Sequence, residues 1–250
     1  MGFAWIRRRR TPAFQSSFLR LSRGVFLGFF VAALGTCCLP VRTSVSPPPP
    51  SVESMEGYIS FRFSNGGTVT KSRLSFIYTR QRLGRIEILD ALNRTVVLIL
   101  IENDRAICGL PTEKVYWQGA WRTVSEKFLG LALSPPEIMA LLCGQWSSTG
   151  GIFPELNEAE SWKLRRESRG RVLGGENGEF GFTIKEFFPG SSVPRSLEFA
   201  HRSGGGRLTT LGLAFNKPAA DDSFRAAFLK DGRYRSVTWE ELEIVLKHES

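Results

Sequence analysis

The chain has 250 residues with 33 lysines and arginines against 24 aspartates and glutamates, a formal net charge of +9. Six of the arginines fall within the first 23 residues, where no acidic residue offsets them, so removing that segment leaves a charge of only +3. Such a balance does not imply a nucleic acid partner. The only histidines, His201 and His248, lie far from each other and from any cysteine, which argues against a zinc site or a histidine-based catalytic triad.

The first predicted element is an export signal over residues 1–36. A basic head precedes the apolar run Val25 to Leu34, which is half the roughly 20 residues that a membrane-spanning helix needs. The run leads into Leu34-Gly35-Thr36-Cys37, which resembles a bacterial lipobox although Thr36 is larger than usual. We therefore predict that Cys37 is lipidated and that the chain is cut before it. Lipidation at Cys38 and an uncleaved anchor helix are the alternatives.

A proline-rich tether is predicted over residues 37–55. Four consecutive prolines, Pro47 to Pro50, favour an extended polyproline spacer of ~3.1 Å per residue. The tether would hold the following domain away from the membrane surface.

Alternating apolar side chains predict β-strands from Gly57 onward. Residues 57–64 and 74–79 flank the turn Asn65-Gly66-Gly67 and predict an antiparallel hairpin. The further predicted strands cover 85–89, 95–101, 105–110, 114–117, 162–167, 180–187, 195–201 and 207–215. Short connections between them favour pairing in sequence order.

Three helical segments interrupt or follow these strands. Residues 125–131 form a short amphipathic piece, and Ser134-Pro135-Pro136-Glu137 predicts a capping box for a helix that ends at Gly144. Thr238 to Glu241 predicts the cap of a last helix. Cys108 and Cys143 could pair in an oxidising compartment, but two buried thiols are the simpler expectation.

These elements predict a mainly β (α+β) fold, a strongly curved antiparallel sheet forming an incomplete barrel with a helical lid. Its apolar interior is either a packed core or a ligand cavity, and periodicity alone does not choose between them. The residues expected to face this interior are the apolar members of each alternating pair and of the lid helix: Ile59, Phe61, Phe76, Ile86, Ile88, Leu98, Ile138, Leu141, Leu142, Phe182 and Leu197.

Residues 57–215 resemble the LolB family, outer-membrane receptors that accept lipoproteins from the periplasmic carrier LolA. The matching pieces are Gly57 to Ser60, Gly84 to Thr95, Leu129 to Pro136 with Leu141 to Gly144, and Pro194 to Phe199 followed by Arg207-Leu208. The resemblance implies a half-barrel over 56–216 whose interior takes acyl chains. It leaves the C-terminal extension, 217–250, without a template.

The same resemblance places Leu92 on a protruding loop that dips into the target membrane. Ala91 and Asn93 stand where the family has proline and glycine. An ordinary turn residue packed against its own hairpin is the alternative for Leu92.

The predicted function is that of a membrane-anchored acceptor that binds acyl chains and helps insert lipoproteins into the outer membrane, facing the periplasm. Its partners would be lipoprotein acyl chains, a LolA-like carrier and outer-membrane lipid, and it would act as a monomer without cofactor or metal. The alternative is a non-catalytic envelope lipoprotein that docks a protein partner. We do not expect an enzyme, because the sequence has no nucleophile elbow, metal-binding cluster or paired carboxylates.

Overall fold

The computed structural model describes residues 45–65, 68–128, 133–146, 162–202, 204–226 and 232–248. All of them belong to one compact unit, residues 43–250. The predicted export signal and the lipidation site Cys37 lie outside the described residues.

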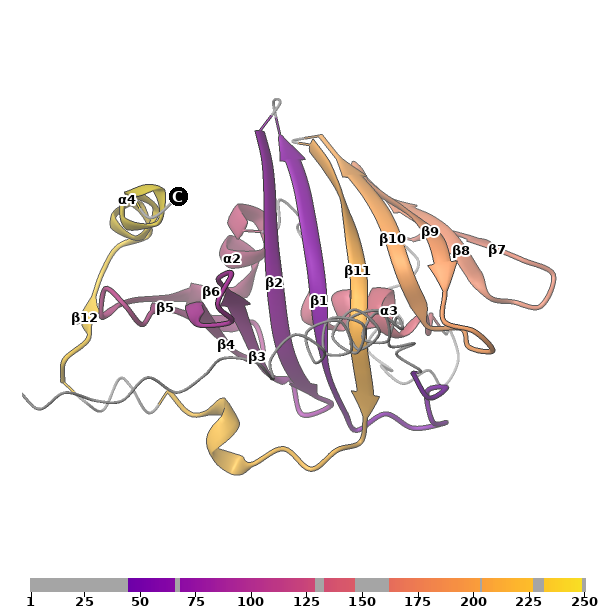
Figure 1. The fold of residues 1–250 in the computed structure, drawn as a ribbon, viewed down its shortest axis with the longest axis horizontal. Coiled ribbons are helices and arrows are strands. Elements are labelled where there is room, and N and C mark those ends of the chain that lie inside the picture. The colour runs from indigo at the N-terminus through magenta and orange to yellow at the C-terminus, as the bar shows by residue number, and fades with distance from the viewer. Residues whose placement is uncertain are drawn as a thin grey trace, which may run out of the picture. The chain divides into compact units, whose positions relative to one another are not determined.

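A single sheet of twelve strands dominates this unit (Figure 1). The strands run in the spatial order β12-β6-β5-β4-β3-β2-β1-β11-β10-β9-β8-β7, and all neighbours are antiparallel except β12 and β6. Their bounds are β1 Ser54–Asn65, β2 Thr68–Thr79, β3 Leu83–Leu89, β4 Thr95–Glu102, β5 Arg105–Leu110, β6 Val115–Ala120, β7 Lys163–Arg166, β8 Val172–Asn177, β9 Phe180–Phe187, β10 Pro194–His201, β11 Gly204–Phe215 and β12 Arg235–Ser236.

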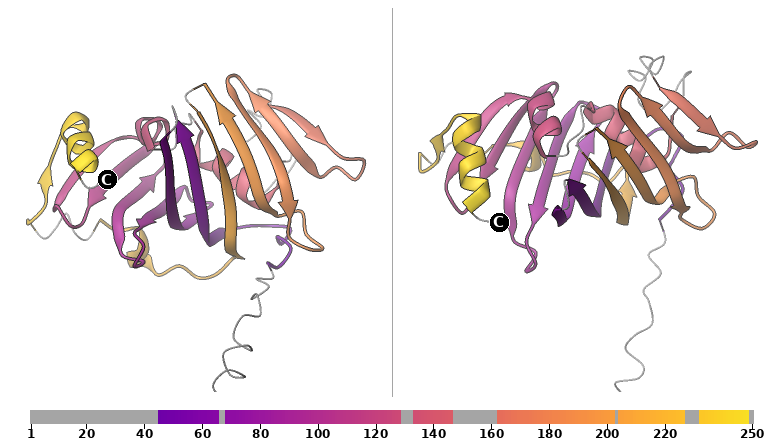
Figure 2. Two further views of the ribbon diagram at one scale, coloured as in Figure 1. Left: turned by 45° about the horizontal axis from the view of Figure 1, so that its top comes forward. Right: turned by 90° about the horizontal axis from the view of Figure 1, so that it is seen from above.

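The predicted mainly β (α+β) class is confirmed, but the sheet is neither closed nor strongly curled, in contrast to the strong curvature expected from the sequence. The order ends in two edge strands, β12 and β7, so the sheet is open, and Figure 2 shows it as a twisted layer. Sheets twist because the backbone of each strand has a preferred right-handed twist. The sheet therefore has two distinct faces, and we call the one that carries the helices the inner face.

Three α-helices lie among the described residues, and their caps follow the sequence. Helix α3 (Pro135–Cys143) has the predicted capping box between Ser134 and Glu137 and ends at Gly144, whose φ is 71°. Helix α4 (Trp239–His248) is capped by reciprocal bonds between Thr238 and Glu241. Helix α2 (Trp121–Phe128) begins four residues before the predicted start, because Trp121 and Val124 extend its buried side.

Strand β8 is absent from the sequence-based prediction because its centre is Gly174-Gly175. Glycine weakens a strand unless a neighbour needs the space. Here a Cβ on Gly175 would lie 2.7 Å from Cδ2 of Leu164 and 2.9 Å from Cε1 of Phe182. The glycines therefore make room for the side chains of the two flanking strands.

The C-terminal extension wraps around one edge of the sheet. Past β11 it crosses the outer face, where the carbonyl of Ser223 accepts a hydrogen bond of 3.1 Å from Nη1 of Arg85. It then pairs in parallel with the edge strand β6 through β12, and α4 packs on the inner face. This covers a strand edge that would otherwise present unpaired backbone groups.

The end of the predicted tether packs against the sheet. Val45 and Val52 are buried, and β1 begins at Ser54, two residues inside the stretch predicted as spacer. Asn216 holds this entry point, since its Oδ1 accepts from the backbone N–H of Glu53 at 2.7 Å and its Nδ2 donates to the carbonyl of Ser51 at 2.9 Å. The chain thus enters the fold at a fixed place, beside the end of β11.

Candidate functional site

An apolar pocket of about 600 Å³ lies between the inner face of the sheet and the helices. Strands β1 to β4, β9, β10 and β11 form its floor, and α2, α3 and α4 supply its other walls. We call it the inner pocket. Its lining consists of Ile59, Phe61, Phe63, Thr70, Ser72, Leu74, Phe76, Ile86, Ile88, Val97, Ile99, Trp121, Val124, Glu126, Lys127, Leu133, Ile138, Met139, Leu141, Leu142, Phe180, Leu197, Phe199, Leu208 and Leu246.

Strand alternation explains why the pocket is apolar. Successive side chains on a strand point to opposite faces, and directly opposite residues on neighbouring strands share a face. Nine of the eleven residues predicted to face the interior line the inner pocket: Ile59, Phe61, Phe76, Ile86, Ile88, Ile138, Leu141, Leu142 and Leu197. That acyl chains enter the pocket stays a prediction.

Leu98 was expected at the inner face, and the structure places it on the outer one. It pairs with Glu87, whereas its neighbours Val97 and Ile99 pair with the pocket residues Ile88 and Ile86. Strand β4 is apolar at six consecutive positions, Val96 to Ile101, so period two gives no signal there. The register of β3 against β4 decides the face instead.

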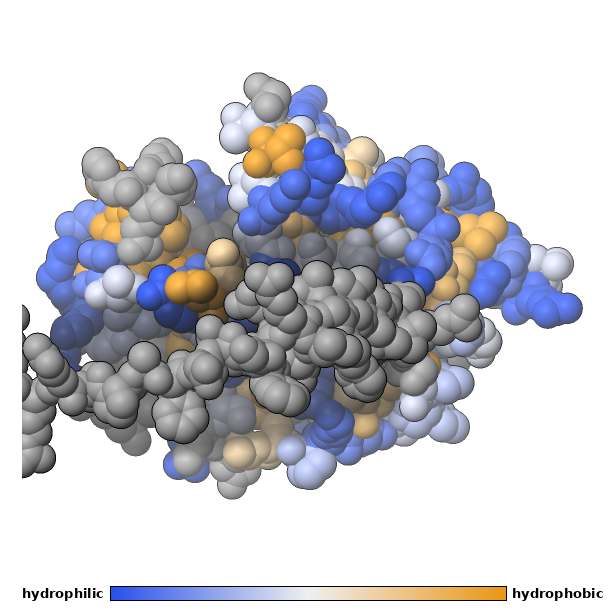
Figure 3. Space-filling model, in the orientation of Figure 1, coloured by the Kyte–Doolittle hydropathy of each residue, from blue (hydrophilic) through white to orange (hydrophobic). Residues whose placement is uncertain are grey.

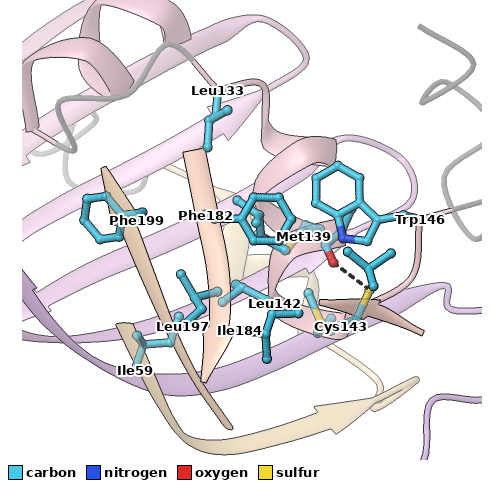
Figure 4. Packing of buried hydrophobic residues seen from close by; sticks show 14 of the residues in the cluster. Ile59, Leu133, Met139, Leu142, Cys143, Trp146, Phe182, Ile184, Leu197 and Phe199 are labelled. Atoms are coloured by element: carbon cyan, nitrogen blue, oxygen red, sulfur yellow. Dashed lines mark hydrogen bonds between the residues drawn. The ribbon is translucent and has the colours of Figure 1, made fainter. Parts of the chain in front are cut away.

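A filled region that we call the aromatic cluster consists of Trp146, Trp162, Phe180 and Phe182, and Phe180 also borders the inner pocket. Phe182 faces inward but does not line the pocket. Its ring stacks on Trp146 at 5.5 Å between centroids, and it meets the Trp162 ring edge-on at 5.7 Å. Figure 4 shows Phe182 beside Met139 and Trp146. Trp146 follows α3 and Trp162 precedes β7, so the periodicity of β9 could not reveal that these rings close the space.

Several pocket residues were missed by the sequence reasoning. Val97 and Ile99 line the pocket because of the register of β4 against β3. Trp121 and Val124 line it because α2 begins earlier than predicted. Leu246 comes from α4 in the C-terminal extension. Its contribution to the pocket depends on where the C-terminal extension folds, which no local pattern encodes.

Hydrogen bonds hold the helices over the pocket. Nε1 of the buried Trp121 donates to the carbonyl of Leu133 at 2.8 Å, which joins α2 to the segment entering α3. Nε1 of Trp162 donates to Oε1 of Glu137 at 2.7 Å, so the capping carboxylate of α3 also binds the aromatic cluster. These bonds fix the pocket walls to each other.

An ion pair connects the C-terminal helix to the same assembly. Nζ of Lys127 on α2 lies 3.2 Å from Oε1 of Glu243 on α4. Both side chains are partly exposed, so solvent screens the pair and its energetic contribution is small. It nevertheless marks where α4 meets the pocket wall.

Leu92 lies in the loop between β3 and β4 with 73% of its surface exposed. Asp90 organises this loop, because its Oδ1 accepts from the backbone N–H groups of Leu92 and Arg94, both at 2.8 Å. These bonds, with the Arg94 guanidinium, lower the pKa of Asp90. The carboxylate therefore stays ionised at neutral pH, and its contribution to the loop is lost only as pH falls through the lowered pKa.

Cys108 and Cys143 are both free and buried, as expected for two inert thiols. They belong to different hydrophobic clusters, Cys143 beside the aromatic cluster and Cys108 under α2 and α4. Burial raises the pKa of each thiol to about 12. Since the thiolate is the reactive form, neither group is a nucleophile at neutral pH.

The chemistry that the pocket offers is apolar burial. Among the residues that the structure describes, the polar side chains at its lining are those of Thr70, Ser72, Glu126 and Lys127. No group of three or more potential metal ligands occurs among the residues that the structure describes. In the same part of the chain, every helix is too short or too polar to cross a bilayer.

No family model and no curated protein matches the sequence. Among solved structures, the chain is similar to a DUF1329 family protein from Desulfovibrio piger, with a TM-score of 0.50 and 12% identity over 70% of this chain and 91% of that one. A LolA superfamily protein from Nitrosomonas europaea gives a TM-score of 0.49 and 10% identity over 73% and 93% of the two chains.

A structure described as an outer membrane lipoprotein-sorting protein domain, from Vibrio parahaemolyticus, gives a TM-score of 0.46 and 12% identity over 74% of this chain and 93% of that one. At identities this low, structural similarity indicates a shared fold but not a shared activity. The chain thus has a fold similar to that of the Desulfovibrio piger protein.

Proposed function

We propose that this protein is a membrane-anchored lipoprotein that binds acyl chains in the inner pocket and helps insert lipoproteins into the outer membrane. The observation that carries the proposal is the pocket itself, an apolar space of about 600 Å³ between the sheet and three helices. Ligand pockets typically measure about 300 to 1,000 Å³. The volume therefore suits a ligand of acyl-chain size, whereas a purely structural module would fill such a space with side chains.

The energetics favour an apolar ligand. Each methylene that leaves water for an apolar site contributes about 0.8 kcal/mol. The polar side chains of Thr70, Ser72, Glu126 and Lys127 offer hydrogen-bonding groups to the polar end of such a ligand. A lipoprotein acyl chain could thus bury its hydrocarbon while its linkage stays near polar groups.

The remaining parts of the proposal come from the resemblance to the LolB family. Cys37 would carry the anchor in the outer membrane, a LolA-like carrier would deliver the cargo, and the sheet with its helices would act as an open half-barrel. Leu92 would touch the receiving membrane, and its exposed position on an ordered loop supports this role.

A pair of matched variants tests acyl-chain binding. Ile88 lines the inner pocket from β3, while Ile77 of β2 lies on the outer face with similar, intermediate exposure. Ile88→Gln should weaken the binding of a fluorescent fatty acid about tenfold, because two or so buried carbon groups at ~0.8 kcal/mol each lose their apolar contact. Ile77→Gln should leave binding unchanged.

Thermal unfolding of both variants separates this effect from misfolding. Equal affinity in the two variants, or no saturable binding by the parent chain, would contradict the proposal and favour the docking lipoprotein.

A further inference from the structure

A row of cations crosses the outer face of the sheet. Arg62 on β1 lies directly opposite Lys71 on β2 and directly opposite Arg207 on β11. Directly opposite side chains have Cβ atoms about 4.5–5.5 Å apart, and like charges at that spacing repel. We call Lys71, Arg62 and Arg207 the cation row.

Little on the protein neutralises this row. Within the described ranges, Arg207 pairs with Glu198, and Glu198 is shared with Lys185 at 2.8 Å. Arg62 and Lys71 have no acidic partner within those same ranges. The repulsion between these cations lowers the stability of the fold, and a carboxylate at either position would relieve it. An anionic partner outside the chain would give a physical reason for keeping the cations.

Exposed aliphatic side chains flank the cations. Val69 lies two positions before Lys71, hence on the same face of β2, and is 44% exposed. Nη1 of Arg73 donates to Oδ1 of Asn93 at 3.4 Å, which connects the strand carrying Lys71 to the Leu92 loop. Figure 3 shows hydrophilic residues over the upper parts of β1, β2 and β11, with a hydrophobic patch among them near the top.

We propose that the cation row docks on anionic phospholipid headgroups and thereby holds Val69 and the Leu92 loop against the bilayer. Basic side chains bind the diffuse negative charge of a membrane, and adjacent aliphatic side chains enter the interface. An acidic protein would satisfy the charges equally well, but it would not require exposed Val69 and Leu92. The inference rests on the proposed function, since it supplies the membrane contact that delivery of acyl chains needs.

A proximity measurement tests the docking. In the full chain with Cys37→Ser and Cys38→Ser, a fluorophore on Ser64→Cys at the exposed end of β1 is the label, because Cys108 and Cys143 are buried. Its quenching by headgroup-labelled lipid is titrated with phosphatidylcholine vesicles and with vesicles containing phosphatidylglycerol. Quenching should be stronger with the anionic vesicles and should fall at high salt.

The decisive comparison uses two variants with the same change of charge. Arg62→Gln/Lys71→Gln should weaken the lipid titration about 25-fold, since each cation near an anionic bilayer contributes roughly fivefold. Lys163→Gln/Arg169→Gln, which removes two exposed cations in and just after β7, should have no effect. Both variants keep the arginines of the first 23 residues, so any contribution of these arginines to lipid binding is the same in the two titrations.

Equal losses in the two variants, or quenching that ignores anionic lipid, would overturn the proposal and leave an acidic protein as the partner of the row. Fatty acid binding is measured on the same samples. Its absence would contradict the acyl-chain pocket, whereas intact fatty acid binding without selective quenching would contradict only the docking surface.

Discussion

The inner pocket and the aromatic cluster lie on the same face of one sheet and are lined by similar side chains, yet only the cluster is filled. In both, alternating residues of the strands provide the apolar floor. The difference comes from the connecting segments, because Trp146 and Trp162 place two indole rings over β9. Over β1 to β4, the helices offer mainly aliphatic side chains such as Ile138 and Leu141. Whether a sheet face becomes core or cavity is thus decided by what covers it.

The largest loss of stability should come from removing a side chain of the filled aromatic cluster. Trp162→Ala removes a ring whose centroid lies 5.0 Å from that of Trp146 and also the hydrogen bond to Glu137. We expect a loss of about 3–5 kcal/mol in the free energy of unfolding, measured with denaturant. Trp162→Phe should lose less, because it keeps a ring. A loss below about 1 kcal/mol for the alanine variant would show that the cluster is no better packed than the pocket.

A smaller loss of stability should come from adding a methyl group to the same cluster. Gly175→Ala would place a Cβ 2.9 Å from Cε1 of Phe182 and should destabilise the protein by about 1–3 kcal/mol. Gly181→Ala, on the neighbouring strand, is the matched control, since its Cβ would meet Cγ of Glu176 at an ordinary 3.8 Å. Thermal melting of the two variants gives the comparison. Equal melting temperatures would mean that the cluster has unoccupied space after all.

The smallest effect on stability is expected outside both regions, at Leu92. Because the side chain is 73% exposed, Leu92→Glu should change the free energy of unfolding by no more than about 0.5 kcal/mol. Delivery of an acylated cargo to vesicles should nevertheless fail, since a carboxylate resists transfer into a bilayer. Leu92→Met is the conservative control. Normal delivery by the glutamate variant would exclude this loop as the membrane contact.

Local sequence patterns were sufficient for most of the fold. The hairpin of β1 and β2, the capping box at Ser134 and the cap at Thr238 each have a short-range physical cause, and all are found. Strand β8 was missed because its glycines have a long-range cause, the packing of Leu164 and Phe182. The path of the C-terminal extension depends likewise on contacts with distant strands.

The residues on the floor of the inner pocket were predictable because strand alternation is a local pattern. The extent of the pocket was not predictable, because it depends on distant residues. Alternation placed residues such as Phe61 and Ile86 correctly on the inner face. It failed at Leu98, where both faces of β4 are apolar, and it could not separate Phe182 from the pocket because the rings of Trp146 and Trp162 come from elsewhere. Periodicity specifies a face, whereas occupancy depends on tertiary contacts.

The entry point at Val45 limits how the protein can lie on a membrane. Val45 packs with Phe188 beside Phe215, and Phe215 pairs with Met55 near the start of β1. From Met55 to Arg62 the strand advances about 23 Å. If Cys37 carries the acyl anchor, the eight residue steps to Val45 can extend by at most about 28 Å. This reach exceeds the advance along β1 by only about 5 Å. An upright posture with the cation row at the bilayer would therefore need residues 37–45 almost fully extended, whereas β1 lying along the membrane plane would leave the linker slack.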